Sequence, residues 1–542
     1  MDEPLLRQTL VFAFATGDIG DGLERIVDQM PLAPTSWEAK DFARDVFLDV
    51  VAERCFPIVI DGKVFPRSRT LLGRIFSAPP SDQRVVRFRQ NILRELAGSS
   101  ELRKSTEALY RELFHLRSLL TKTTATRVDP FERRLAVLRA LRDTAHVAGT
   151  GFRTAKSGLA KISTWGAETV ATEGYARLTE LLAYEEKAAE VDVRIHIGFD
   201  GKIRDLTVIE RREPTDNAFH QGPAGRFTAK LGLFVRGYDF SIHELFARLA
   251  DEVFDGVVDS FLTAFPLMGD LEFYLGCLGF RDATRRAGLD VTLPTFVPGE
   301  GHAMLGLYNP LLLSEGSRVV PCDLATGSDD ARVIVTGPNS GGKTRLLQSI
   351  AIAQILGQAG AFVPAKSARL PWASGLFVSI IENAQADQRE GRLGTEMLRI
   401  RKLFESLRAG SLVVLDELCS GTNPSEGEEI FRLVVKLLGE LRPAAFITTH
   451  FLAFARRLAD ESSSLEFLQV ELDAEERPTY LFVPGVAVTS LAHKTAARLG
   501  VTEDALRALV LRNNPEIEQE SSKPGRSREL PASHLGSDAR LS

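Results

Sequence analysis

The sequence predicts a chain of two unlike parts: a mainly α-helical region with a small β-hairpin insertion, followed by an α/β domain. Residues 1–190 carry apolar residues at helical spacing. From about residue 303 to 512, strand-like runs alternate with helical runs, which favours a parallel sheet covered by helices. We therefore expect four segments, with bounds 1–190, 191–302, 303–512 and 513–542.

The helical prediction for the first segment is clearest between residues 101 and 141. The stretch "ELRKSTEALYRELFHLRSLL" places leucines on one helical seam, at Leu109, Leu113, Leu116 and Leu120. Asp129-Pro130 suits the start of a following helix, whose apolar stripe begins at Phe131. We expect these helices to pack as a hairpin or bundle.

The second segment opens with a change of period. "VDVRIHIGFDGKIRDLTVIE" alternates apolar and polar residues on both sides of Asp200-Gly201, a pair typical of tight hairpin turns. A helical stretch over roughly 242–288 follows. Pro294 and Pro298 then mark a boundary before the α/β domain.

Composition places the chain among ordinary globular proteins, with 44% apolar and 25% charged residues in 542. No run approaches the roughly 18–20 apolar residues that span a bilayer, and the N-terminus lacks a signal-peptide layout. The four cysteines lie far apart in the sequence, which suggests reduced thiols in the cytoplasm. We also expect no membrane partner. The polar tail 513–542 is expected to be disordered.

The net charge of −6 conceals an asymmetry. Residues 84–161 contain 17 Lys/Arg and 7 Asp/Glu, a net +10, so the rest of the chain carries −16. A basic segment in an acidic protein can contact a phosphate backbone, which would make DNA a partner. Charge alone equally allows a solvated helix face balanced by acidic neighbours.

The strongest chemical motif is "VIVTGPNSGGKT", a buried-type strand that runs into a glycine-rich turn. Its last eight residues fit G-x-x-x-x-G-K-[ST], which predicts a P-loop that binds a nucleotide such as ATP. The backbone amides would face the phosphates at the positive end of the following helix. Lys343 would reach the β- and γ-phosphates, and Thr344 would ligate Mg²⁺. The predicted phosphate-binding residues are Gly337, Pro338, Asn339, Ser340, Gly341, Gly342, Lys343 and Thr344.

Two later strand ends complete the expected site. "SLVVLDEL" ends in Asp416-Glu417, where Asp416 suits Mg²⁺ binding and Glu417 can act as general base on water. "AAFITTHF" places His450 after another strand, where it can sense the γ-phosphate. A lone acidic pair or histidine is weak support for a site, but their order after the glycine-rich turn favours one.

Together "TGPNSGGKT", "AFVPA", "LVVLDELCSGTNPSEG" and "TTHF" resemble the MutS family of DNA mismatch-repair and recombination ATPases, within the wider ABC group. "LGLYNPLLL" resembles the entry to that ATPase domain, and "YLFVPGVAVTSLAHKTAARLG" its closing segment. The resemblance is strong over residues 303–512 and thin over 190–302. It identifies the third segment as an α/β P-loop ATPase domain of ABC/MutS type.

The resemblance implies a homodimer with ATP at the interface and a DNA clamp whose helical arms respond to nucleotide. Ser420, Gly421, Thr422 and Asn423 match the loop that crosses to the partner subunit. The basic segment 84–161 would belong to the arms. An ATPase activity, slow in turnover, is therefore expected.

The sequence departs from the family pattern in three places, one of which is that the short tail after residue 512 leaves no room for an appended nuclease domain. No Phe-x-Glu occurs in the chain, so the family's mismatch-reading domain and wedge are not expected. The Ser-rich trans-acting signature is shortened to "REGRLGTEMLRIRKLF", in which Thr395 offers the hydroxyl before Glu396. Two alternatives therefore stay open: an ABC-type switch that acts on a protein without DNA, and a nucleotide-binding scaffold with little turnover.

Overall fold

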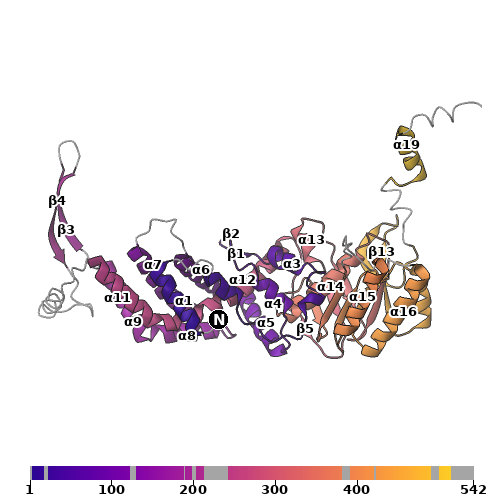
Figure 1. Ribbon diagram of the computed structural model, residues 1–542, viewed down its shortest axis with the longest axis horizontal. Coiled ribbons are helices and arrows are strands. Elements are labelled where there is room, and N and C mark those ends of the chain that lie inside the picture. The colour runs from indigo at the N-terminus through magenta and orange to yellow at the C-terminus, as the bar shows by residue number, and fades with distance from the viewer. Residues whose placement is uncertain are drawn as a thin grey trace, which may run out of the picture.

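The computed structural model describes the following residues: 3–17, 22–121, 130–187, 190–197, 203–212, 242–380, 391–419, 423–489 and 500–513. The described chain is elongated, with helices at one end and an α/β domain at the other (Figure 1). Calls on the turn at Asp200-Gly201, on residues 420–422 and on the tail after 513 lie outside these ranges.

The N-terminal part is built from helices that pack side by side. Its helices are α1 (Glu3–Thr16), α2 (Gly22–Asp28), η1 (Ala39–Asp41), α3 (Leu48–Cys55), α4 (Leu71–Ser77), α5 (Gln83–Gly98), α6 (Ser100–Thr121), α7 (Pro130–Gly151), α8 (Ala160–Val170) and α9 (Glu173–Lys187). The predicted leucine seam of α6 is buried throughout, as are three residues on the stripe of α7. Helices α6 and α7 lie antiparallel to each other (Figure 1). Residues 122–129, which connect them, are outside the described ranges.

The sequence analysis missed one small hairpin inside this helical part. Strands β1 (Ile58–Ile60) and β2 (Lys63–Phe65) pair antiparallel around Asp61-Gly62. Both turn residues have positive φ, 50° and 75°, which matches the two-residue turn that Asp-Gly favours. The signal "IVIDGKVF" is therefore present in the sequence, but the strands are only three residues long.

The hairpin and the helices predicted for residues 191–302 are present in the structure. Strands β3 (Glu190–Ile197) and β4 (Ile203–Arg212) pair antiparallel at the far end of the molecule (Figure 1). Helices α11 (Ile242–Val257), η2 (Val258–Phe261) and α12 (Ala264–Arg286) follow. Helix α12 is buried along most of its length, and a Cβ at Gly279 would meet the Pro57 carbonyl oxygen at 1.8 Å, so glycine permits this close packing.

The α/β domain is centred on a six-stranded sheet in the order β10-β11-β12-β8-β13-β14. All neighbouring pairs are parallel except β13 and β14. The strands are β8 (Arg332–Thr336), β10 (Leu376–Ser379), β11 (Leu412–Leu415), β12 (Ala444–Thr448), β13 (Leu465–Leu472) and β14 (Pro478–Pro484). The mixed α/β character expected from the sequence is confirmed.

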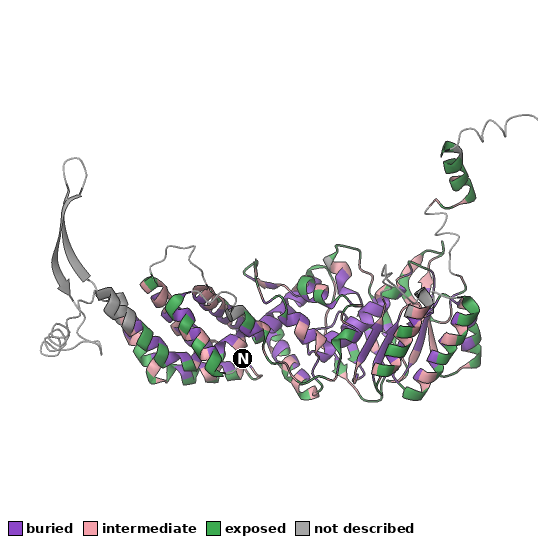
Figure 2. Cartoon of the chain, in the orientation of Figure 1, coloured by how far each residue is buried: buried purple, intermediate pink, exposed green. Residues whose placement is uncertain are grey.

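Helices cover both faces of this sheet, which explains the unbroken apolar runs of its strands. Along β8, Val333 and Val335 face the core shared with α14 (Lys343–Gln358), whereas Ile334 faces the opposite core. That opposite core contains buried residues of α15 (Gly391–Ser406), α16 (Pro424–Leu441) and α17 (Leu452–Glu461). Figure 2 shows the buried sheet between exposed helix faces.

A second sheet, which the strand–helix pattern does not predict, joins the two parts. Its order is β5-β9-β6-β7, with strands β5 (Thr295–Phe296), β6 (Ala303–Leu307), β7 (Cys322–Ala325) and β9 (Ser367–Leu370). These strands are two to five residues long and mostly antiparallel, so they lack the repeating pattern of the main sheet. Helix α13 (Pro310–Ser314) follows β6, and α19 (Glu503–Asn513) stands apart near the end (Figure 1).

No single helix among the described residues is long and apolar enough to cross a membrane. One bent pair, Leu249–Phe261 with Ala264–Arg286, meets that test by length and composition.

Candidate functional site

The candidate site lies at the carboxyl edge of the parallel sheet, where three strands end. Strand β8 leads into the loop Gly337–Thr344, β11 into Asp416-Glu417, and β12 into Thr449-His450. Because β12 lies between β11 and β8, its end separates the acidic pair from the glycine-rich loop. Parallel strands thus bring three distant sequence motifs to one edge.

The glycine-rich loop has the backbone freedom that its composition predicts. Gly337 and Gly342 adopt φ of 140° and 90°, and α14 begins directly after Gly342. A Cβ at Gly341 would meet the Pro338 carbonyl oxygen at 2.9 Å and the Val470 side chain at 3.0 Å. The loop therefore packs against β13. It leads directly into the amino end of α14, a helix of 16 residues.

Lys343 is held inside this loop rather than at the surface. Its side chain is only 5% exposed, and Nζ donates to the carbonyl oxygens of Gly337 at 2.9 Å and Pro338 at 3.1 Å. Burial lowers the pKa of Lys343, while the nearby charges of Glu417 and Asp416 raise it. The ammonium group is thus a buried cation between the loop and the acidic pair.

A continuous set of hydrogen bonds joins the loop to both acidic residues. Thr344 Oγ1 donates to Asp416 Oδ2 at 2.6 Å, and Thr448 Oγ1 donates to Asp416 Oδ1 at 2.5 Å. The same Thr448 hydroxyl accepts from the Glu417 backbone N–H at 2.7 Å. Thr448 therefore holds both acidic residues from the middle strand. The sequence analysis missed this contact because it depends on β12 lying next to β11.

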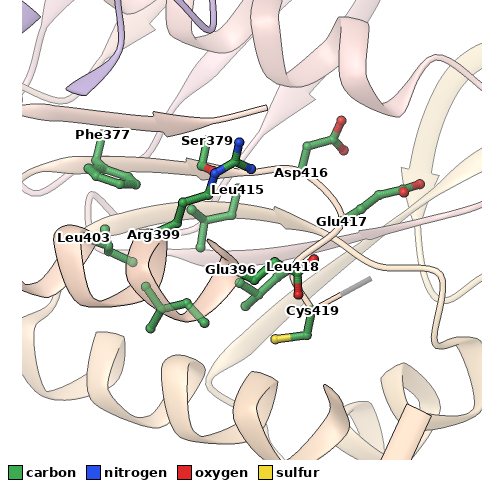
Figure 3. A pocket seen from close by; sticks show the side chains of 11 residues that line it. Phe377, Ser379, Glu396, Arg399, Leu403, Leu415, Asp416, Glu417, Leu418 and Cys419 are labelled. Atoms are coloured by element: carbon green, nitrogen blue, oxygen red, sulfur yellow. The ribbon is translucent and has the colours of Figure 1, made fainter. Parts of the chain in front are cut away.

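The turn after β11 is conformationally unusual. Glu417 and Cys419 have positive φ of 48° and 63°, which side-chain-bearing residues seldom adopt. Asp416 and Glu417 point away from helix α15, whereas Cys419 lies beneath the turn with Glu396 of that helix (Figure 3). Burial, with a smaller contribution from Glu396, raises the pKa of Cys419 to about 12, so this thiol stays protonated.

A cavity of about 460 Å³ adjoins the loop. Asn339 through Thr344 form one side, and Glu417 also lines it. Tyr308 and Leu312 lie on the wall that follows β6, and Tyr480 and Phe482 of β14 line it as well. Tyr480 holds a positive φ of 67°, a second sign of backbone strain at this site.

Two predicted site residues, His450 and Asn423, do not contact the loop or the acidic pair in the hydrogen bonds described above. His450 is exposed, its ring lies 4.1 Å from that of Phe451, and it does not line the 460 Å³ cavity. Asn423 caps α16 by accepting from the Ser425 N–H at 3.3 Å. The Thr395 side chain lies outside the described side chains, although its neighbour Glu396 is buried beside the acidic turn.

Comparison with known proteins matches this region to one family. A family profile described as MutS domain V matches residues 333–503, which include the loop and all three strand ends. Three relatives named Endonuclease MutS2 are 30–32% identical: those of Thermomicrobium roseum (32%), Thermus thermophilus (30%) and Streptococcus gordonii (30%). The alignments cover 43–44% of this chain but only 30–31% of each relative.

Proposed function

We propose the following function on the premise that the chain belongs to the MutS family, to which its domain V match and its relatives assign it. The chain is an ATPase that binds ATP at the glycine-rich loop and hydrolyses it with the acidic pair after β11. One observation carries the proposal: the hydrogen bonds that run from Thr344 through Asp416 and Thr448 to Glu417. These bonds support the proposal because they connect the loop with the two acidic residues.

The loop suits the triphosphate of ATP. The amino end of α14 and the Lys343 ammonium both favour negative charge at the same place. The aromatic and aliphatic wall formed by Tyr308, Leu312, Tyr480 and Phe482 suits the apolar faces of a nucleoside. A cavity of about 460 Å³ has room for both ends of such a ligand.

Thr344 and Asp416 are the residues that would hold Mg²⁺. They supply one hydroxyl and one carboxylate within hydrogen-bond distance, and Mg²⁺ prefers a few protein oxygens combined with phosphate oxygens and water. When bound, the ion supplies charge neutralisation of the phosphates. Among the described residues, no cluster of three His, Cys, Asp or Glu side chains offers an all-protein metal site, which agrees with a shared site.

Glu417 is the residue that we assign to proton abstraction from the attacking water. Its carboxylate lines the cavity, and Thr448 fixes its backbone, so its position relative to Lys343 is set by the sheet. His450 stands at the neighbouring strand end and is proposed as a γ-phosphate sensor. Because its ring now lies against Phe451, that role requires the imidazole to turn toward the loop.

A homodimer is the proposed assembly, with residues 420–423 crossing to the partner's nucleotide. Helix α19 and its approach support a second copy, because they leave large apolar side chains in solvent. These are Val488 (81% exposed), Val501, Leu506, Leu509 and Val510. Exposed apolar side chains on a helix that stands away from the body of the molecule, as on α19, are typical of an interaction surface.

DNA is the proposed partner of the helical part, but the charge of residues 84–161 is more internal than its sum suggests. Arg89 donates to the Ala359 carbonyl, and six arginines pair with acidic groups: Arg84, Arg103, Arg111, Arg117, Arg134 and Arg142. In the described part of this segment, the exposed basic side chains are Arg84, Arg87, Arg94, Lys104, Arg111, Arg153, Lys156 and Lys161, of which Arg84 and Arg111 are paired with Asp82 and Asp61. Only these exposed side chains can meet the phosphate backbone of DNA from the described part of the segment.

Five of these exposed residues belong to adjoining elements. Glu95 of α5 accepts from the Lys156 backbone N–H at 2.6 Å, and the Lys161 ammonium lies 5.5 Å from the Phe88 ring centroid. We name the exposed side chains of Arg87, Arg94, Arg153, Lys156 and Lys161 the α5–α8 basic face. It is the surface that we propose for the phosphate backbone.

The second candidate function, an ATPase switch that acts on a protein without DNA, is favoured by the internal pairing of the arginines. A DNA-binding panel separates the two. Duplex, branched and mismatched DNA would be titrated with and without ATP at several salt concentrations, using protein of measured oligomeric state. We expect affinity that falls as salt rises. Absence of binding at low salt with ATP present would exclude DNA and leave the protein-directed switch.

The nuclease activity in the relatives' names is not assigned to this chain. The alignments cover about 31% of those relatives, and the site described above contains ATPase chemistry only. Steady-state phosphate release tests the ATPase itself. Lys343→Ala should weaken ATP binding about tenfold or more, because it removes a charge-assisted contact to phosphate. Tight ATP binding by this variant would contradict the assignment of the loop.

A further inference from the structure

One large aromatic side chain is exposed beside the α5–α8 basic face. Phe88 of α5 leaves 42% of its surface in solvent, and it directly follows Arg87 in the sequence. The opposite face of the same helix is buried, at Val86, Ile92 and Leu93 among others. Single apolar side chains are common on protein surfaces, so the surroundings of this ring decide what it can bind.

The ring of Phe88 is held in place by its neighbours. A Cβ at Gly158, in the turn before α8, would lie 2.3 Å from Phe88 Cζ and 2.9 Å from Ile92 Cδ1, so the absence of a side chain lets this turn pack against the ring edge. The Lys161 ammonium lies 5.5 Å from the ring centroid, within cation–π range. The protein therefore presents the ring to solvent in a defined position.

The charges beside this ring favour a negatively charged ligand. Arg87 precedes the ring on α5, and Lys161 is an exposed, flexible side chain that can make room on the ring while its charge stays close. Glu95 is an acid of the same helix, but its carboxylate accepts from the N–H groups of residues 156 and 157 at 2.6 Å and 3.0 Å. These donors partly offset its charge, so the face keeps an excess of positive charge.

Other exposed aromatic rings of the described residues lack this setting. Phe12 lies on α1, which contains one arginine and one glutamate, and Phe47 has an aspartate two residues away on either side. Tyr480 belongs to the candidate ATP site. Outside that site, an exposed aromatic ring and a basic face therefore coincide at Phe88 in the part of the chain that the structure describes.

We propose that the α5–α8 basic face binds single-stranded or locally unpaired DNA, with one unpaired base stacked on the Phe88 ring. The inference rests on the proposed DNA-binding function and names the form of DNA that this face selects. Inside a duplex, neighbouring base pairs cover both flat faces of each base. In an unpaired strand one face is open, and an aromatic side chain can stack on it while cationic side chains hold the phosphates.

This contact distinguishes the form of DNA rather than its sequence. Every base has an aromatic face, so stacking on Phe88 tolerates all four bases. The basic side chains alone would attract the phosphates of a duplex and of a single strand alike. The aromatic ring therefore carries the selection, and the cations carry the sequence-independent attraction.

Fluorescence anisotropy of the whole chain tests the proposal with two labelled probes, an oligo-dT strand of about 20 nucleotides and a duplex of the same length. Phe88→Leu keeps an apolar side chain against Gly158 but removes the aromatic face. We expect it to weaken single-strand binding about fivefold or more, with duplex binding within about twofold of the parent. Phe12→Leu, at an exposed position of α1, is the matched control and should change neither affinity.

Phe88→Trp supplies a second, direct measurement. It keeps an aromatic face, so it should retain single-strand binding, and its indole fluorescence should be quenched by oligo-dT but not by the duplex. Parent-level single-strand binding by Phe88→Leu, an equal loss for both probes, or unquenched Phe88→Trp would each overturn the proposal. If Phe88→Leu melts below the parent, the Phe88→Trp result decides.

The same probes separate this proposal from the proposed function beneath it. If the parent chain binds neither probe at low salt, DNA is not the partner, and both proposals fail. If the parent binds duplex and single strand but Phe88→Leu binds both as the parent does, the basic face can still bind DNA, and only base stacking on Phe88 is refuted.

Discussion

The α/β domain and the helical part use charge in opposite ways. At the carboxyl edge of the main sheet, Lys343, Asp416 and Glu417 all face one cavity, or the loop beside it, within the span of three neighbouring strands. In the helical part, arginines such as Arg103 and Arg117 turn inward and pair with acidic residues of α6 and α12. The charged residues at the strand ends therefore meet at one edge of the sheet, whereas a charge sum over a helical segment does not say where the charges lie.

The largest expected effect comes from the acidic pair. Glu417→Gln should reduce ATP turnover about 100-fold or more while ATP binding persists, because the amide keeps its shape but cannot accept the proton of water. Single-turnover and steady-state phosphate release would be measured beside ATP binding. Glu440→Gln, an exposed change on α16, is the control. Unchanged turnover in Glu417→Gln would remove Glu417 as the base.

Thr448→Val should have the next largest effect and would show that the middle strand positions both acidic residues. It removes the hydroxyl that donates to Asp416 Oδ1 and accepts from the Glu417 N–H. We expect kcat to fall about tenfold, with a higher Mg²⁺ requirement and little change in ATP affinity. Thr449→Val removes a different buried hydrogen bond, from the Phe451 N–H at 3.1 Å, and should leave the Mg²⁺ requirement close to that of the parent. Equal losses in the two variants would mean general destabilisation.

The two parts also differ in how far the sequence predicts them. The loop 337–344 and Asp416-Glu417 were identified because short motifs follow buried strands, and strand order then brings their ends together. Thr448 was missed because its contacts depend on β12 lying between β11 and β8, a fact of topology rather than spacing. The four-stranded sheet was missed because β5, β6, β7 and β9 are too short to show a period.

In the helical part, the sequence predicts the helices but not their partners. The leucine seam of α6 is a local pattern, and the structure buries it. The ion pair of Arg103 with Asp282 joins residues 179 positions apart, which no local pattern contains. The same limit applies to the cavity of about 240 Å³ beside His302, at the opposite edge of the main sheet from the glycine-rich loop, because its walls come from six separate stretches of the chain.

Charge reversal on the α5–α8 basic face tests whether this set of exposed basic residues binds DNA. The triple change Arg87→Glu, Lys156→Glu and Lys161→Glu should weaken DNA binding at least tenfold and flatten its salt dependence. Titration of labelled duplex at several salt concentrations measures both. Arg285→Glu, Arg286→Glu and Lys436→Glu, at three exposed positions outside this face, change the net charge by the same amount and are the matched control. Equal weakening by the control would mean that binding follows net charge rather than this surface.

The smallest expected effect concerns Glu272, a buried acid of the helical part that takes no part in ATP chemistry. Its carboxylate accepts from the Ser68 N–H at 2.9 Å and the Tyr110 hydroxyl at 3.3 Å, with Arg117 at 4.0 Å. Burial, only partly offset by these contacts, raises its pKa from 4.5 to about 7. The folded chain therefore keeps a proton that the unfolded chain loses between these two values.

Folding stability from this group is consequently greatest below about pH 4.5 and is lost as pH rises to about 7. Glu272→Gln stays neutral, so its melting temperature relative to the parent should rise from pH 5 to pH 8, by an amount equivalent to at most a few kcal/mol. Thermal unfolding followed by circular dichroism at both pH values measures the difference. Glu101→Gln, an exposed change on α6, should show no such trend. A pH-independent difference for Glu272→Gln would mean that the carboxylate is already ionised at pH 5, and that its arginine neighbours outweigh its burial.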